Sequence, residues 1–195
     1  MVGKDTFSLV FFEGSIGELL QAEDSDTSNR LGHFSDVMNL NHLFAFLQET
    51  QNLKALMKKD FTSQLPELIV KPVVGDFLKN FQNTDNNPAL FQYKLACWQY
   101  KHMKYAAALI SLQEGILSYA CQIAHHDCND KEERQLVKDR ICNEQDFLPY
   151  ELRGVYFAVT KNRNVVAHAL ESELSSGKII DNLRKSLETV GKYIL

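Results

Sequence analysis

The stretch PALFQYKLACWQYKHMKYAAALISLQEGILSYACQIAH (88–125) decides the fold class, because it is the longest run with a helical pattern. Pro88 is a good first-turn residue of a helix. Apolar residues such as Leu95, Leu109 and Leu117 fall on more than one helical face. We therefore expect a single long helix here, central in the fold and largely enclosed by other helices.

Shorter helices are expected before this stretch. Ser35 offers a side-chain oxygen that can cap a helix, and an amphipathic pattern runs from there to about Lys59. Pro66 and Pro72 are expected to break the following segment, because proline removes a helical hydrogen bond. A short helix over residues 73–81 completes this part of the prediction.

Further helices are expected after the central stretch. A charged pattern predicts a helix over 131–142, and a Phe-Leu-Pro turn at 147–149 leads into a helical stretch over 150–170. The final helix has apolar residues at regular helical spacing over 179–194. The predicted class is all-α, a bundle of four to five main helices with a short non-helical N-terminal segment.

The N-terminal segment is predicted to be irregular. FSLVFF (7–12) suggests a short strand or an apolar peg, and AEDSDTSN (22–29) suggests an acidic loop. The chain is therefore divided into an N-terminal extension (1–34), a helical linker region (35–87) and a main helical domain (88–195).

Charge is unevenly distributed along the 195 residues, whose formal net charge is −4. Residues 1–29 hold six acidic residues against Lys4, while residues 30–195 hold 20 basic and 19 acidic residues. Any contact with nucleic acid must therefore come from a local basic patch. No apolar run approaches the roughly 18 residues needed to span a bilayer, and no signal sequence is evident, so a soluble cytoplasmic protein without a membrane partner is expected.

The stretch CQIAHHDC (121–128) combines thiols and imidazoles, which are ligands that zinc prefers. Its spacing fits no familiar zinc pattern, and only Cys142 follows it. We expect reduced thiols at all four cysteines, a helix end carrying polar residues, and neither a metal nor another cofactor.

The segment KNRNVVAHA (161–169) carries the chemistry. Asn164 and His168 are four residues apart, so on a helix they share one face, and Asn164 can orient the imidazole. Arg163 precedes His168 by five residues and can reach the same space. One group can thus move protons near neutral pH while a fixed cation matches a phosphate.

These groups suffice for metal-independent cleavage of RNA. A base takes the proton of the ribose 2′-hydroxyl, the oxygen attacks the adjacent phosphate, and a cation stabilises the developing charge. The products would carry 2′,3′-cyclic phosphate and 5′-hydroxyl ends. DNA is expected to be inert because it lacks the attacking hydroxyl.

RNVVAH (163–168) resembles the Arg-Asn-x3-His form of the motif of the HEPN superfamily of ribonucleases. YKHMKYAAALISLQEGILSYACQIA (100–124) is similar to the long early helix of HEPN domains in type III CRISPR-associated ribonucleases, and the likeness covers roughly residues 88–195. Residues 35–60 resemble the helical linker that joins a CARF sensor domain to HEPN in those proteins.

The resemblance implies antiviral defence and a homodimer in which each chain contributes Arg163, Asn164 and His168 to a composite cleft for single-stranded RNA. No CARF domain precedes residue 35, and 34 residues cannot make one. The chain is a fragment, or a relative without its sensor, or one in which residues 7–12 are a remnant strand. A separate or missing CARF-type sensor is therefore expected.

Three further residues are candidates. Lys161 and Arg153 could steer RNA toward the cleft, and Glu114 could pair with Arg163 across the bundle. Each has a plain alternative, since scattered surface charges are usually only solvated. The alternatives for the whole chain are a toxin-like HEPN nuclease of a toxin–antitoxin pair and a non-catalytic helical scaffold that binds RNA or a protein partner.

Overall fold

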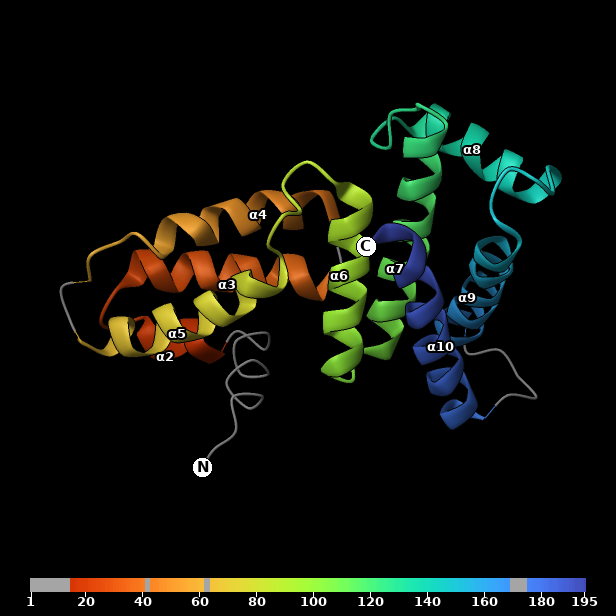
Figure 1. The fold of residues 1–195 in the computed structure, drawn as a ribbon. Coiled ribbons are helices and arrows are strands. Elements are labelled where there is room, and N and C mark those ends of the chain that lie inside the picture. Colours follow the sequence, from red (N-terminus) through yellow and green to blue (C-terminus); the bar gives the residue numbers. More distant parts are fainter. Residues whose placement is uncertain (1–14, 41–42, 62–63, 169–174) are drawn as a thin grey trace. The chain divides into compact units, whose positions relative to one another are not determined.

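A computed structural model describes residues 15–40, 43–61, 64–168 and 175–195, and these form nine α-helices and no strand. The all-α class is thus confirmed, with more helices than the four to five expected (Figure 1). The chain divides into two compact units, unit 1 (Met1–Gln82) and unit 2 (Asn83–Leu195). The predicted strand or peg at 7–12 lies outside the described residues.

Unit 1 contains α2 (Ser15–Leu20), α3 (Ser25–Asn39), α4 (Leu43–Leu56) and α5 (Gln64–Asn80), and each helix packs against the next. Its core is a cluster of phenylalanine rings. Phe77 lies with its ring centroid 5.2 Å from that of Phe34, 6.1 Å from that of Phe46 and 4.7 Å from that of Phe81. Such tilted and edge-to-face pairs are the arrangements that aromatic rings favour.

The predicted loop at 22–29 is wrong from Ser25 onward, because α3 begins there. Asp24 caps α3, accepting a hydrogen bond from the Thr27 amide at 3.1 Å, and Lys59 donates to the same carboxylate at 2.8 Å. Ser35, expected to start a helix, is buried within α3 instead. The polar residues that suggested a loop are therefore the first turn of a helix.

The predicted break at Pro72 is also wrong, since α5 continues through it. Pro72 is exposed, and so is Leu68, whose carbonyl loses its helical donor. Water can satisfy that carbonyl, while Val70, Val74 and Phe77 bury the opposite side of the helix. Burial of this apolar face outweighs the lost hydrogen bond.

Unit 2 contains α6 (Pro88–Lys101), α7 (Tyr105–Ile123), α8 (Lys131–Asn143), α9 (Tyr150–His168) and α10 (Ser176–Ile194). Figure 1 shows α7 among the other helices of the unit, and it contacts α6, α8, α9 and α10. Leu109, Leu112 and Ile116 of α7 are completely buried in an aliphatic core. The helices predicted over 131–142 and 150–170 are confirmed where the structure describes them.

The single long helix expected over 88–125 is two helices, α6 and α7, which form a hairpin (Figure 1). Met103 has a φ of 60°, the Lys104 amide donates to the Gln99 carbonyl at 2.9 Å, and the Met103 amide donates to the Tyr100 carbonyl at 3.0 Å. This is a Schellman ending, which usually uses glycine at the left-handed position. The hairpin closes tightly because Gly115 lets α6 approach: a Cβ there would lie 3.3 Å from the Tyr93 nitrogen.

Candidate functional site on helix α9

Helix α9 positions the Arg-Asn-x3-His segment at its C-terminal end. The face toward the core carries Leu152, Tyr156 and Val159, which are 0%, 5% and 0% exposed. These residues recur at steps of three and four, so the rest of the motif has a defined place around the helix axis. By the helical step of about 100° per residue, Arg163 falls within this buried face, about one turn beyond Val159.

Gln113 of α7 holds Arg163 in place. The Arg163 Nη1 atom donates to Gln113 Oε1 at 3.3 Å, and Arg163 is half-buried. Gln113 is buried and also hydrogen-bonds the Tyr156 hydroxyl. Burial raises the pKa of Tyr156, and the bond with Gln113 opposes that rise. The guanidinium is therefore oriented by a neutral acceptor, and no carboxylate in the described part of the chain forms an ion pair with it.

Asn164 and His168 fall on another side of α9. Asn164 is half-buried, and His168 is the last residue of the helix, with a side chain outside the described part of the chain. The helical step places positions 164 and 168 about 140° and 180° from Val159 around the axis. Both positions therefore lie on the outward side of α9, and the hydrogen bond expected between their side chains stays a prediction.

The expected pairing of Glu114 with Arg163 is not what the structure has. Glu114 pairs with Arg134 of α8, whose guanidinium also donates to the Cys128 carbonyl at 2.9 Å. Neighbouring residues of a helix point about 100° apart, so Gln113 faces α9 while Glu114 faces α8. The sequence pattern indicated the charged residue on α7, but the partner of Arg163 is the adjacent polar residue, Gln113.

The two candidate RNA contacts differ in their surroundings. Lys161 is exposed on α9. Arg153 is half-buried and donates to the carbonyls of Ile141 and Cys142, each at 2.8 Å, at the end of α8. Its guanidinium also lies 5.0 Å from the centroid of the Phe157 ring. Arg153 therefore joins α8 to α9 in addition to carrying a positive charge.

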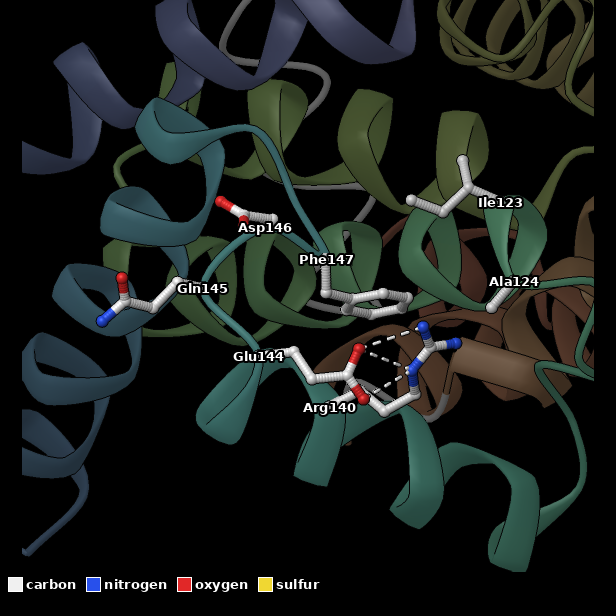
Figure 2. Close-up of a pocket in the computed structure, with 7 residues that line it drawn as sticks. All are labelled: Ile123, Ala124, Arg140, Glu144, Gln145, Asp146 and Phe147. Atoms are coloured by element: carbon white, nitrogen blue, oxygen red, sulfur yellow. Dashed lines mark hydrogen bonds and ion pairs between the residues drawn. The ribbon is translucent and has the colours of Figure 1, made fainter.

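A separate hollow of about 590 Å³ lies between the end of α7 and the loop that follows α8 (Figure 2). In it the Arg140 guanidinium lies 4.1 Å from the Phe147 ring centroid and donates to Glu144 at 3.1 Å. Ile123, which lines it, is about 15 Å along α7 from Gln113. The hollow is thus apart from the Arg163 contact, and its arginine is already paired.

The Cys/His stretch forms a helix end. His125 has a φ of 57° after the last turn of α7, and His126 Nδ1 lies 3.1 Å from Glu133. Burial raises the pKa of the Cys121 and Cys128 thiols, which disfavours the thiolates that bind metals. Within the described ranges, no three His, Cys, Asp or Glu side chains are grouped so that they could hold a metal ion. No helix in those ranges is long and apolar enough to cross a bilayer.

Comparison with known proteins adds information about one part of the chain. Residues 13–87 match the family model described as CRISPR-associated protein MJ1674, second domain. The match supports the expected CRISPR association, and it ends before α6. Searches of curated proteins and of solved structures found no match. The chain therefore contains a region similar to a domain of a CRISPR-associated protein, followed by a unit that carries the Arg163 motif.

Proposed function

We propose that this chain is a metal-independent, CRISPR-associated endoribonuclease of the HEPN type that cleaves single-stranded RNA. The observation that carries the proposal is the arrangement on α9. Arg163 is held by Gln113 and has no ion pair with the described carboxylates, and Asn164 and position 168 lie about 100° and 140° from it around the axis of α9. A fixed cation and a proton-transfer group on one helix end are what 2′-hydroxyl attack requires.

Each motif residue has one role in the reaction. His168 takes the 2′-hydroxyl proton, and the freed oxygen forms a bond to phosphorus. The bond from phosphorus to the 5′-oxygen then breaks, and that oxygen receives a proton, leaving a 2′,3′-cyclic phosphate. Arg163 stabilises the charge on the phosphate oxygens through its forked donors, and Asn164 orients the imidazole.

The proposal includes a homodimer. A single α9 carries one Arg163, Asn164 and His168 set at its C-terminal end, and two-fold symmetry would bring two such sets to one cleft. A composite cleft supplies a base for one proton and an acid for the other. The resemblance of residues 35–60 to the linker between a CARF sensor and HEPN suggests regulation by a CARF-type sensor, in the same polypeptide or a separate one.

The test is cleavage of an end-labelled single-stranded RNA by the full chain in excess EDTA. His168→Ala and Arg163→Ala should each lower the rate by at least about 100-fold. Gln113→Leu should lower it less, because Arg163 keeps its charge and loses only its orientation. An all-deoxy strand of the same sequence should remain intact, and the RNA products should end in cyclic phosphate.

Two exposed residues provide matched controls, His33→Ala in unit 1 and Arg184→Ala on α10. Both should cleave like the native chain. Cleavage that survives His168→Ala would refute the mechanism. RNA or protein binding without cleavage would favour the non-catalytic scaffold, an alternative that gains weight because the family match lies outside the motif. Light scattering should give the mass of a dimer.

A further inference from the structure

The outward side of α9 carries two exposed aromatic rings in line with the motif. Tyr150 is 91% exposed and Phe157 is 39% exposed. Lys161 is exposed as well, and Asn164 and position 168 follow at the helix end. The helical step keeps these five positions within about 60° of one another, roughly opposite the buried face. We call Tyr150, Phe157 and Lys161 the α9 stripe.

The ring of Phe157 is packed against two neighbouring side chains of α9. The Arg153 guanidinium lies 5.0 Å from the Phe157 ring centroid, and carbonyls at the end of α8 fix that guanidinium at 2.8 Å. The Tyr156 ring meets Phe157 edge-on, with centroids 5.8 Å apart and planes at 72°. An exposed ring with a fixed orientation loses little conformational entropy when a flat partner stacks on it.

Charge identifies the kind of partner. Helix α9 contains Arg153, Lys161 and Arg163 against Glu151 alone, so it is locally positive in a chain whose net charge is −4. The Glu151 carboxylate is 3.5 Å from the Tyr193 hydroxyl, on the side of α9 that faces α10. A partner with planar apolar groups and negative charge fits this surface, and single-stranded nucleic acid has both.

A second copy of the chain fits the stripe less well. The two rings are separated by about 10 Å along the axis, so they do not make a continuous apolar face. A two-fold axis through the stripe would also place one positive helix against another, which is unfavourable unless an anion lies between them.

We propose that the α9 stripe is a track for single-stranded RNA, in which one base stacks on Tyr150 and another on Phe157. Lys161 contacts a phosphate between these bases and the motif, so the strand is delivered along the helix toward Asn164 and position 168. The direction of delivery rests on the proposed function. The stacking does not, because it depends only on the rings and the local charge.

The test is binding of a fluorescently labelled, unstructured RNA 12-mer of mixed sequence to the full chain carrying His168→Ala, which keeps the RNA intact. Tyr150→Ala and Phe157→Ala should each weaken binding about 5- to 100-fold, the effect of losing one base stack. Tyr150→Phe should bind normally because the ring is retained. Lys161→Ala should reduce the dependence of log K on log salt by about 0.7.

Leu136→Ala on α8 is the matched control, since Leu136 is also apolar and 54% exposed, and it should bind like the parent. The proposal is overturned if the parent does not bind RNA, or if the two alanine variants bind like the control. It is also overturned if those variants convert a dimer to a monomer and bind RNA only in proportion to the dimer left.

The outcomes separate this proposal from the proposed function. Loss of binding in the stripe variants of a chain that never cleaves RNA would support the track and refute the nuclease. Cleavage that depends on His168, with unchanged binding by the stripe variants, would do the reverse.

Discussion

Unit 1 and unit 2 are both helical, but they differ in core and charge. Unit 1 packs around the phenylalanine rings of α3, α4 and α5, while unit 2 packs aliphatic side chains of α7 against those of its neighbours. Unit 1 has seven basic and eleven acidic residues, and unit 2 has fourteen of each. The whole negative balance of the chain therefore belongs to unit 1.

The units also differ in what they say about function. The family match covers most of unit 1, whereas the arginine, asparagine and histidine of the proposed ribonuclease site are in unit 2. The family match and the proposed site residues thus lie in different parts of the chain. A function assigned from the match alone would overlook α9, and one assigned from the motif alone would overlook the CRISPR association.

The largest expected loss of stability tests whether the phenylalanine cluster stabilises unit 1 alone. Phe77→Ala should cost about 3–5 kcal/mol, because it removes three ring contacts and leaves a cavity. Hydrogen exchange should show faster exchange in α3, α4 and α5, with α7 and α9 unchanged. Phe77→Leu, which fills most of the space, should cost less. Equal loss of protection in both units would break the comparison.

A smaller effect tests the close packing of unit 2. A Cβ at Gly191 of α10 would lie 2.4 Å from the hydroxyl oxygen of Tyr93, which donates to the Leu187 carbonyl at 3.2 Å. Gly191→Ala should therefore destabilise the chain by about 1–3 kcal/mol in denaturant unfolding. Repeating it in a Tyr93→Phe background should reduce the penalty, since the clashing oxygen is gone. An unchanged penalty in that background would contradict this account.

The smallest expected loss of stability concerns Asp24, one of the acidic residues of unit 1. The hydrogen bond from Lys59, with those from Thr27, lowers the pKa of Asp24 from 3.8 to about 2. A carboxyl whose pKa is lower in the folded chain stabilises the fold above its unfolded pKa. That stabilisation is lost as pH falls from about 4 to about 2.

Asp24→Asn should remove this pH dependence and cost about 1 kcal/mol at neutral pH, because asparagine still caps the helix while the ion pair is lost. Acid titrations of unfolding by circular dichroism measure both. Glu67→Gln, at an exposed ion pair within α5, is the control and should leave the acid transition in place. An acid transition that persists in Asp24→Asn would show that other carboxyls cause it.

Sequence patterns predicted the all-α class and the helices of the C-terminal part, where apolar spacing and turn residues agree. They failed where an unusual residue occupied a structural position. The break between α6 and α7 uses Met103 at a left-handed position that normally signals itself by glycine, so nothing in the sequence marked it. At Pro72 the error was the opposite: a break was predicted, but α5 continues because tertiary packing outweighs the effect of the proline.

The sequence predicted the motif residues of the candidate site but not the residue that holds Arg163 in place. The spacing of Arg163, Asn164 and His168 follows from helical geometry alone. The partner of Arg163 depends on the rotation of α7 against α9, which distinguishes Gln113 from Glu114 and which no local pattern reports. The exposed rings of the α9 stripe likewise required the packing of unit 2 to be known.

Both ends of α7 finish in a left-handed residue, Met103 just before it and His125 just after it. The helix therefore lies between two left-handed corners, and the number of residues between them sets the position of Gln113. One inserted residue before Gln113 would rotate it by about 100° and separate it from Arg163. For anyone grafting or shuffling this part of the chain, α7 must be moved whole.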